Sequence, residues 1–146
     1  MEGLFSLADR AFLWASSSTG LGYELLNILF YCFLVPGIWC TILLVRLRSG
    51  ASAAVLALHL AMALLFVTAA PESLQNEFYA RCLRQLHAWG SATSRSYTTI
   101  AVLAGVPAPV LATALLVFAP RRFLPLLFAL EILLLFSVLF CAWFFY

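Results

Sequence analysis

The hydrophobic positions of this chain fall into four long runs separated by shorter polar segments. The runs are 20 to 24 residues long, and each contains at most one Asp, Glu, Lys, Arg or His. They cover residues 25–45, 51–70, 99–119 and 123–146. A helix needs about 20 apolar residues to cross a bilayer. The pattern therefore predicts an all-α integral membrane protein with four transmembrane helices.

Two of the connections between these runs are too short to be anything but tight turns. They are residues 46–50 and 120–122, and each holds two arginines. Helices joined by so short a segment lie side by side, so the crossings are expected to form two hairpins whose turns face the same side. The side of the membrane that holds the turns has four arginines, and the opposite side also has four. The turn arginines, however, are concentrated at the membrane boundary. We therefore expect both turns inside, in the cytosol or matrix, and both termini outside.

Residues 1–15 and 71–89 mix polar and apolar side chains at helical spacing. Both segments are too polar to cross a bilayer, and amphipathic helices of this kind lie in the headgroup plane. A turn is expected at residues 16–20, and Gly90 suits the position just past the end of the second segment. The predicted architecture is two transmembrane hairpins plus two amphipathic interfacial helices.

The order of interfacial helix, crossing, turn and crossing occurs twice along the chain. A shift of 73 residues superposes Phe5 on Phe78, Pro36 on Pro109 and Arg48 on Arg121, whereas identity elsewhere is near what this composition gives by chance. Internal repeats of this kind occur in transporter folds. We expect a single transmembrane domain over residues 1–146, with a twofold repeat of residues 1–73 and 74–146 as a hypothesis.

The composition excludes several classes of protein. Hydrophobic residues make up 65% of the 146 positions, against about 45–50% in soluble domains, and four crossings leave no room for a soluble catalytic domain. The net charge of +2 gives no reason to expect nucleic acid as a partner. Cys32, Cys40, Cys82 and Cys141 form no C-x-x-C pair and are interpreted as small buried residues.

Glu131 and His59 are the strongest candidates for intramembrane chemistry. Each lies nine residues from a predicted turn, which is about 13 Å into the membrane at 1.5 Å per residue. A charge at that depth costs several kcal/mol, so Glu131 is expected to face protein or water in its protonated form. The two groups could pair as a proton relay or as an anchor for a quinone or lipid headgroup. The alternative is a hydrogen bond that locks helices together.

Other polar and helix-breaking residues carry weaker signals. Asn27 is expected to hydrogen-bond across helices. Kinks are expected near mid-depth in the first and third crossings, where they could build a site or only fit one helix to its neighbours; the residues are Pro36, Gly37, Pro107 and Pro109. The turn arginines are candidates for anionic lipid headgroups; they are Arg46, Arg48, Arg121 and Arg122.

Several kinds of chemistry lack their sequence signatures. The chain has no metal-ligand cluster, no H-E-x-x-H and no phosphate-binding glycine loop. His59 and His87 lie at different depths, which argues against a bis-histidine haem. We therefore predict no catalytic residue, no cofactor and no metal.

Three functional classes remain. The first, which we favour, is a non-catalytic accessory subunit of a larger membrane complex, with other transmembrane subunits and anionic lipids as partners. An energy-transducing complex of the respiratory-chain or ATP-synthase type fits best, because such complexes collect small, motif-poor hydrophobic subunits. The second is a small oligomeric transporter or channel that uses the kinked helices together with Glu131 and His59, which lie at the same depth in the membrane. The third is a membrane enzyme acting on a lipid or quinone. Four cysteines in a lysine-free chain favour the mitochondrial inner membrane over a bacterial plasma membrane.

Overall fold

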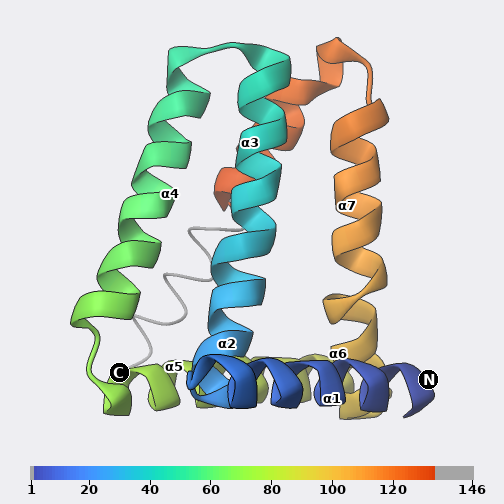
Figure 1. The fold of residues 1–146 in the computed structure, drawn as a ribbon. Coiled ribbons are helices and arrows are strands. Elements are labelled where there is room, and N and C mark those ends of the chain that lie inside the picture. Colours follow the sequence, from blue (N-terminus) through green and yellow to red (C-terminus); the bar gives the residue numbers. More distant parts are fainter. Residues whose placement is uncertain (1, 134–146) are drawn as a thin grey trace. The chain divides into compact units, whose positions relative to one another are not determined.

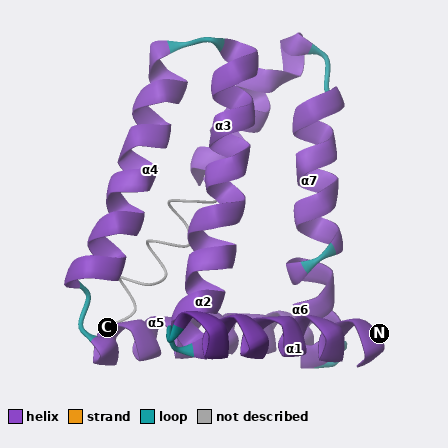
Figure 2. Ribbon diagram, viewed as in Figure 1, coloured by secondary structure: helices purple, strands orange, loops and turns teal. Residues whose placement is uncertain are grey.

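The computed structural model describes residues 2–133, which are almost entirely helical and contain no strand (Figures 1 and 2). This part of the prediction is confirmed. The elements are α1 (Glu2–Thr19), α2 (Tyr23–Ile28), the π-helix η1 (Leu29–Leu34), α3 (Val35–Leu47), α4 (Gly50–Ala69), α5 (Glu72–Ala92), α6 (Tyr97–Gly105), α7 (Pro107–Phe118) and the 3-10 turn η2 (Arg121–Phe123). Residues 124–133 continue as a helix.

Three helical stretches are long and apolar enough to cross a membrane, as an integral membrane protein requires. They are Tyr23–Leu47 with 25 residues, Gly50–Ala69 with 20 and Tyr97–Phe118 with 22, and they coincide with the first three predicted crossings. The predicted fourth crossing is helical over residues 124–133. Its remainder, together with Cys141, lies outside the described residues.

The chain forms two compact units, and each takes one segment from either half of the sequence. The first unit comprises residues 1–28 and 71–109, and the second comprises residues 29–70 and 110–146. The boundaries at residues 28/29 and 109/110 fall where regular α-helix is interrupted, by η1 and near the start of α7 respectively. Each unit is described by itself below.

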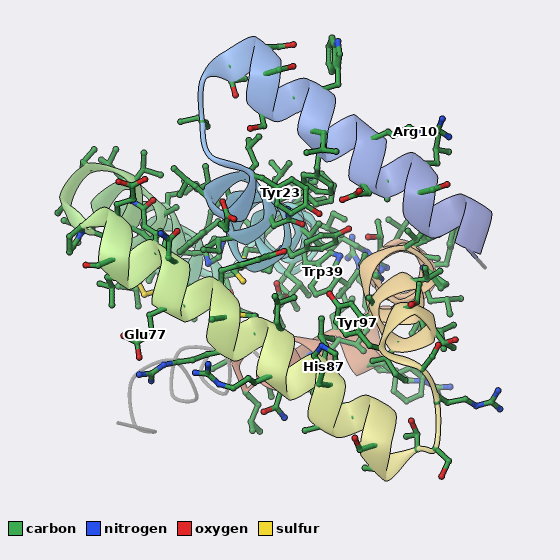
Figure 3. The ribbon with its side chains drawn as sticks, turned by 90° about the horizontal axis from the view of Figure 1, so that it is seen from below. Arg10, Tyr23, Trp39, Glu77, His87 and Tyr97 are labelled. Atoms are coloured by element: carbon green, nitrogen blue, oxygen red, sulfur yellow. The ribbon has the colours of Figure 1, made fainter. Side chains whose placement is uncertain are left out.

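The first unit contains α1, α2, α5 and α6, and Tyr23 lies at its centre. The Tyr23 hydroxyl donates to Asp9 Oδ1 at 2.7 Å, and the ring makes edge contacts with Phe12 of α1 and Tyr79 of α5. Figure 3 shows the side chains of His87 and Tyr97 facing each other, and their rings stack with centroids 4.2 Å apart. Aromatic and hydrogen-bonded contacts therefore join α1, α5 and α6 to the start of the first membrane-spanning helix.

Two helix ends in this unit differ from the prediction. The turn expected at residues 16–20 begins later, because α1 continues to Thr19 and Gly20, at φ 74°, makes the turn. Within this last turn, Ser18 and Thr19 donate side-chain hydrogen bonds to the carbonyls of Trp14 and Ala15. Gly90 lies inside α5, which continues to Ala92. A Cβ at Gly90 would lie 3.0 Å from the Arg95 carbonyl oxygen, so glycine here permits a close approach of the returning chain.

The second unit contains η1, α3, α4, the remainder of α7 and the helix over residues 124–133. Helices α3 and α4 run side by side in opposite directions (Figure 1). Their turn is shorter than the predicted residues 46–50, because α3 continues to Leu47 and α4 begins at Gly50. Arg48 adopts a left-handed conformation with φ 51°, and the Ser49 side chain caps α4 by accepting from the Ser52 amide.

The core of the second unit lies toward the end that carries the α3–α4 turn. Leu43 of α3, Leu116 of α7 and Leu124 pack together, and Leu43 and Leu124 are fully buried. Arg46 joins the same elements, since its guanidinium donates to the carbonyl of Leu116 and, at 2.8 Å, to that of Ala119. These carbonyls belong to the C-terminal end of α7, which lacks amide partners and favours a cation.

Candidate functional site

One face of the helical stretch Tyr23–Leu47 contacts two buried ionisable side chains of the second unit, those of His59 and Glu131. Phe33, Gly37 and Cys40 are spaced four and three residues apart, so they lie on one face of the helix. Phe33 belongs to η1, and Pro36, which has no amide hydrogen, lies in the first turn of α3. Short π-helices inside longer helices are frequent at functional sites. We call the face formed by Phe33, Gly37 and Cys40 the α3 face.

His59 of α4 packs directly against the α3 face. Its Nε2 lies 2.8 Å from the carbonyl oxygen of Phe33, and its ring is tilted against the Phe33 ring. A Cβ added at Gly37 would lie 3.5 Å from Cδ2 and 3.6 Å from Nε2 of His59. The glycine therefore allows the imidazole to lie against the backbone, where it is 1% exposed.

Glu131 approaches the α3 face from the helix that follows η2. Leu124, Leu127 and Phe128 of this helix pack in the core of the second unit, and Glu131 follows them at helical spacing. Glu131 is 7% exposed, and its Oε1 accepts a hydrogen bond from Cys40 Sγ at 3.4 Å. Cys40 itself is 1% exposed.

His59 Nδ1 and Glu131 Oε2 stand out because both are buried and, in the part of the chain that the structure describes, have no hydrogen-bond partner. The structure brings both residues to the α3 face, at contact points three residues apart. No hydrogen bond within residues 2–133 joins the two side chains directly. Instead, His59 Nε2 bonds to the Phe33 carbonyl and Glu131 Oε1 bonds to Cys40 Sγ. The arrangement leaves one free imidazole nitrogen and one free carboxyl oxygen in an apolar interior.

Sequence reasoning missed Cys40 as a partner for Glu131 and interpreted it only as a small buried residue. It also missed Trp39, whose indole Nε1 donates to the Thr113 hydroxyl of α7 at 2.9 Å. Both contacts join residues more than 70 positions apart. A hydroxyl and an indole near the same depth in two apolar runs are a weak signal for such a bond, because many other helix pairings would be equally compatible with them.

The remaining sequence-predicted residues are placed as follows. The side-chain amide of Asn27 donates at 2.9 Å to the carbonyl of Tyr23 on its own helix, in contrast to the expected bond across helices. The third crossing is divided at Val106, with Pro107 and Pro109 in the first turn of α7. A residue before proline is disfavoured in helical conformation, and Val106 has φ −121°.

The four arginines considered as lipid contacts have different environments. Arg46 is partly buried, with its guanidinium bound to backbone carbonyls. Arg48, Arg121 and Arg122 are exposed, and the Arg122 guanidinium lies 4.8 Å from the centroid of the Phe123 ring. Three guanidinium groups of the second unit are therefore accessible to an anion.

Neither disulfides nor metal sites are formed by the described residues. Cys32, Cys40 and Cys82 carry no disulfide, and no group of three or more His, Cys, Asp or Glu side chains between residues 2 and 133 is arranged to hold a metal ion. Comparison of the chain with protein-family models, curated proteins and solved structures finds no match.

Proposed function

We propose that the chain is a non-catalytic transmembrane subunit of a larger membrane complex, in which it contributes helix packing and lipid contacts. The complex we favour is an energy-transducing one of the respiratory-chain or ATP-synthase type in the mitochondrial inner membrane. The proposed architecture is four crossings as two hairpins, with α1 and α5 in the outer interface, both turns inside and both termini outside.

The observation that carries this proposal is the outward face of α4. One face of this helix is turned into the second unit, where Ser52 and His59 are buried. On the opposite face, Ala53, Ala57 and Ala61 recur every four residues, and all three are exposed. Only 11% of the most hydrophobic window of this helix is buried within the chain.

A stripe of small residues favours a second helix over lipid as the neighbour of this face. Helices associate in membranes through close backbone contact, which residues such as alanine permit at a spacing of four. A surface that faces only lipid has no need of small side chains, because leucine is equally soluble in hydrocarbon. The exposed leucines that flank the stripe, Leu60 and Leu64, would then pack around the partner helix.

The exposed turn arginines support the lipid part of the proposal. Arg48, Arg121 and Arg122 are exposed, and each guanidinium can donate paired hydrogen bonds to a phosphate. Their sequence positions next to the ends of α3 and α7 correspond to the headgroup level in the proposed arrangement. Anionic lipids are therefore the expected ligands of this end of the second unit.

The test is the assembly state of the full chain after extraction from its native membrane in mild detergent. Native gels with mass spectrometry should find the wild-type chain in a large complex, and Ala57→Leu should reduce that co-migration by filling the close contact. Ala51→Leu is the matched control, because Ala51 is an exposed alanine of the same helix that lies off the stripe. Migration of the wild type as a monomer or as a homodimer alone would reject the subunit role, and the homodimer would favour the transporter or channel alternative.

A further inference from the structure

The unpartnered atoms of His59 and Glu131 have complementary hydrogen-bonding roles. His59 Nε2 faces the Phe33 carbonyl at 2.8 Å, and a carbonyl only accepts, so Nε2 carries the hydrogen. In a neutral imidazole the other ring nitrogen then holds a lone pair. His59 Nδ1 is therefore a buried acceptor without a donor among the described residues.

Glu131 has the opposite role, that of a hydrogen-bond donor. Oε1 accepts the thiol hydrogen of Cys40, and an ionised carboxylate without a cationic partner is very costly in an apolar interior. The neutral carboxyl group places its hydrogen on the oxygen that is not already accepting one, which is Oε2. Glu131 Oε2 is therefore a buried donor without an acceptor in the described part of the chain.

The points at which His59 and Glu131 contact the α3 face are separated by less than one helical turn. His59 contacts Gly37 and Glu131 contacts Cys40, and three residues correspond to about 4.5 Å along a helix axis. Two hydrogen bonds of about 2.8 Å, made through one water, span about 5 Å. A water at this position would accept from Oε2 and donate to Nδ1, which satisfies both orphan atoms.

We propose that His59, Glu131 and one bound water form an intramembrane proton-binding site on the α3 face. Transfer begins when the Oε2–H bond of Glu131 breaks and its proton passes to the water oxygen. The water releases a different proton to His59 Nδ1, so that the water is regenerated. The product is a carboxylate held by the Cys40 thiol and an imidazolium held by the Phe33 carbonyl, with no change in the total number of protons.

This proposal does not depend on the subunit role. In a purely structural polar contact, each buried donor is expected to be hydrogen-bonded to a buried acceptor. Here the donor Glu131 Oε2 and the acceptor His59 Nδ1 lie on different helices and are not bonded to each other. Cys40, the titratable neighbour on the α3 face, is already engaged with Glu131 Oε1. The two remaining polar atoms, one acceptor and one donor, are those that a water can satisfy together.

The experiment uses the full chain, purified and reconstituted in lipid nanodiscs. In ¹⁵N-histidine-labelled wild type, the His59 resonances should show a hydrogen on Nε2 and an accepted hydrogen bond at Nδ1; His87→Gln assigns the signals by removing the other histidine. In infrared spectra, a protonated-carboxyl band should vanish in Glu131→Gln. The same band should shift in His59→Phe and stay in place in the control His87→Phe.

The bridging water has its own signature. A hydrogen-bonded O–H band of the wild type should move when the sample is exchanged into H₂¹⁸O, and it should be lost in Glu131→Gln. Three results would each overturn the proposal: a neutral His59 with its hydrogen on Nδ1 and none on Nε2, the absence of a protonated-carboxyl band, or a carboxyl band whose position does not change in His59→Phe. The ¹⁵N-histidine signals need only the wild type and His87→Gln, which lies outside the site, and the H₂¹⁸O shift needs only the wild type. A variant of Glu131 or His59 that fails to fold therefore does not remove the test.

Discussion

Arg46→Ala should destabilise the second unit more than any other substitution of an arginine in the turns. The Arg46 guanidinium donates to two carbonyls at the C-terminal end of α7, those of Leu116 and Ala119. A hydrogen bond to a charged group contributes about 1.5–3 kcal/mol, so two bonds give an upper value of about 3–6 kcal/mol. Arg46 is only partly buried, and water can replace part of the loss, which leaves an expected cost of about 2–3 kcal/mol.

The measurement is equilibrium unfolding in mixed detergent micelles, followed by tryptophan fluorescence. Trp39 is a suitable reporter because it bonds to Thr113 of α7 across the same helix pair. A cost of 2–3 kcal/mol corresponds to an increase of about 30- to 150-fold in the unfolding equilibrium constant. Arg46→Lys should recover about half of the loss, since an ammonium group keeps the charge without the planar fork of a guanidinium.

Arg48→Ala is the matched control for this prediction. Arg48 is exposed and lies two residues away, at the C-cap of α3, so its removal should change stability by less than about 0.5 kcal/mol. Equal stability of Arg46→Ala and Arg48→Ala would show that the guanidinium does not hold α7 to α3. The assigned arrangement of these two helices would then be wrong.

Three further predictions concern packing and titration. Leu43→Ala, at a fully buried position, should cost about 2–5 kcal/mol of unfolding free energy, whereas Val45→Ala at an exposed position should cost little in the same unfolding assay. Gly90→Ala should lower the melting temperature because its Cβ would lie 3.0 Å from the Arg95 carbonyl oxygen, whereas Gly50→Ala, with nothing within 4 Å, should leave it unchanged or raise it. Burial raises the pKa of the Tyr79 hydroxyl; the resulting stabilisation is present below the unfolded pKa of about 10 and is lost as pH rises through the folded value. The tyrosinate absorbance that Tyr79→Phe removes should therefore appear at a higher pH than that of denatured chain, and an equal midpoint would contradict this assignment.

The positions of the helices could be predicted from sequence because hydrophobic length and turn chemistry are local properties. The stretch Tyr23–Leu47 and the α3–α4 turn follow from where apolar runs end and polar residues begin. The ends of α1 and α5 were missed for an equally physical reason. In α1 the serines and threonine of residues 16–19 are compatible with helix as well as with a turn, so the break falls at Gly20 with its positive φ. In α5 the close approach of the Arg95 carbonyl, a contact with the returning chain, requires glycine at position 90 inside the helix.

The partners inside the candidate site could not be predicted from sequence. A helix that is apolar on every side gives no indication of which side faces its neighbour. Depth placed His59 and Glu131 at one level, and the structure takes both to the α3 face. The choice of Phe33 and Cys40 as their partners depends on the rotation of each helix about its own axis. That rotation is set by contacts such as Leu43 with Leu124, which join segments about 80 residues apart in the chain.

The helix over residues 124–133 takes part both in the core of the second unit and in the proposed proton-binding site. Leu124 packs beside Leu43, and Glu131 follows it by seven residues, two helical turns along the same face. The contacts that hold this helix to α3 therefore also hold the Glu131 carboxyl at the level of Cys40. Two unpaired buried polar atoms would cost about 1–3 kcal/mol each, a large part of the 5–15 kcal/mol that stabilises a typical protein. Leucine at both positions would avoid that cost if packing were the only requirement, so the presence of an imidazole and a carboxyl group favours a site that a water completes.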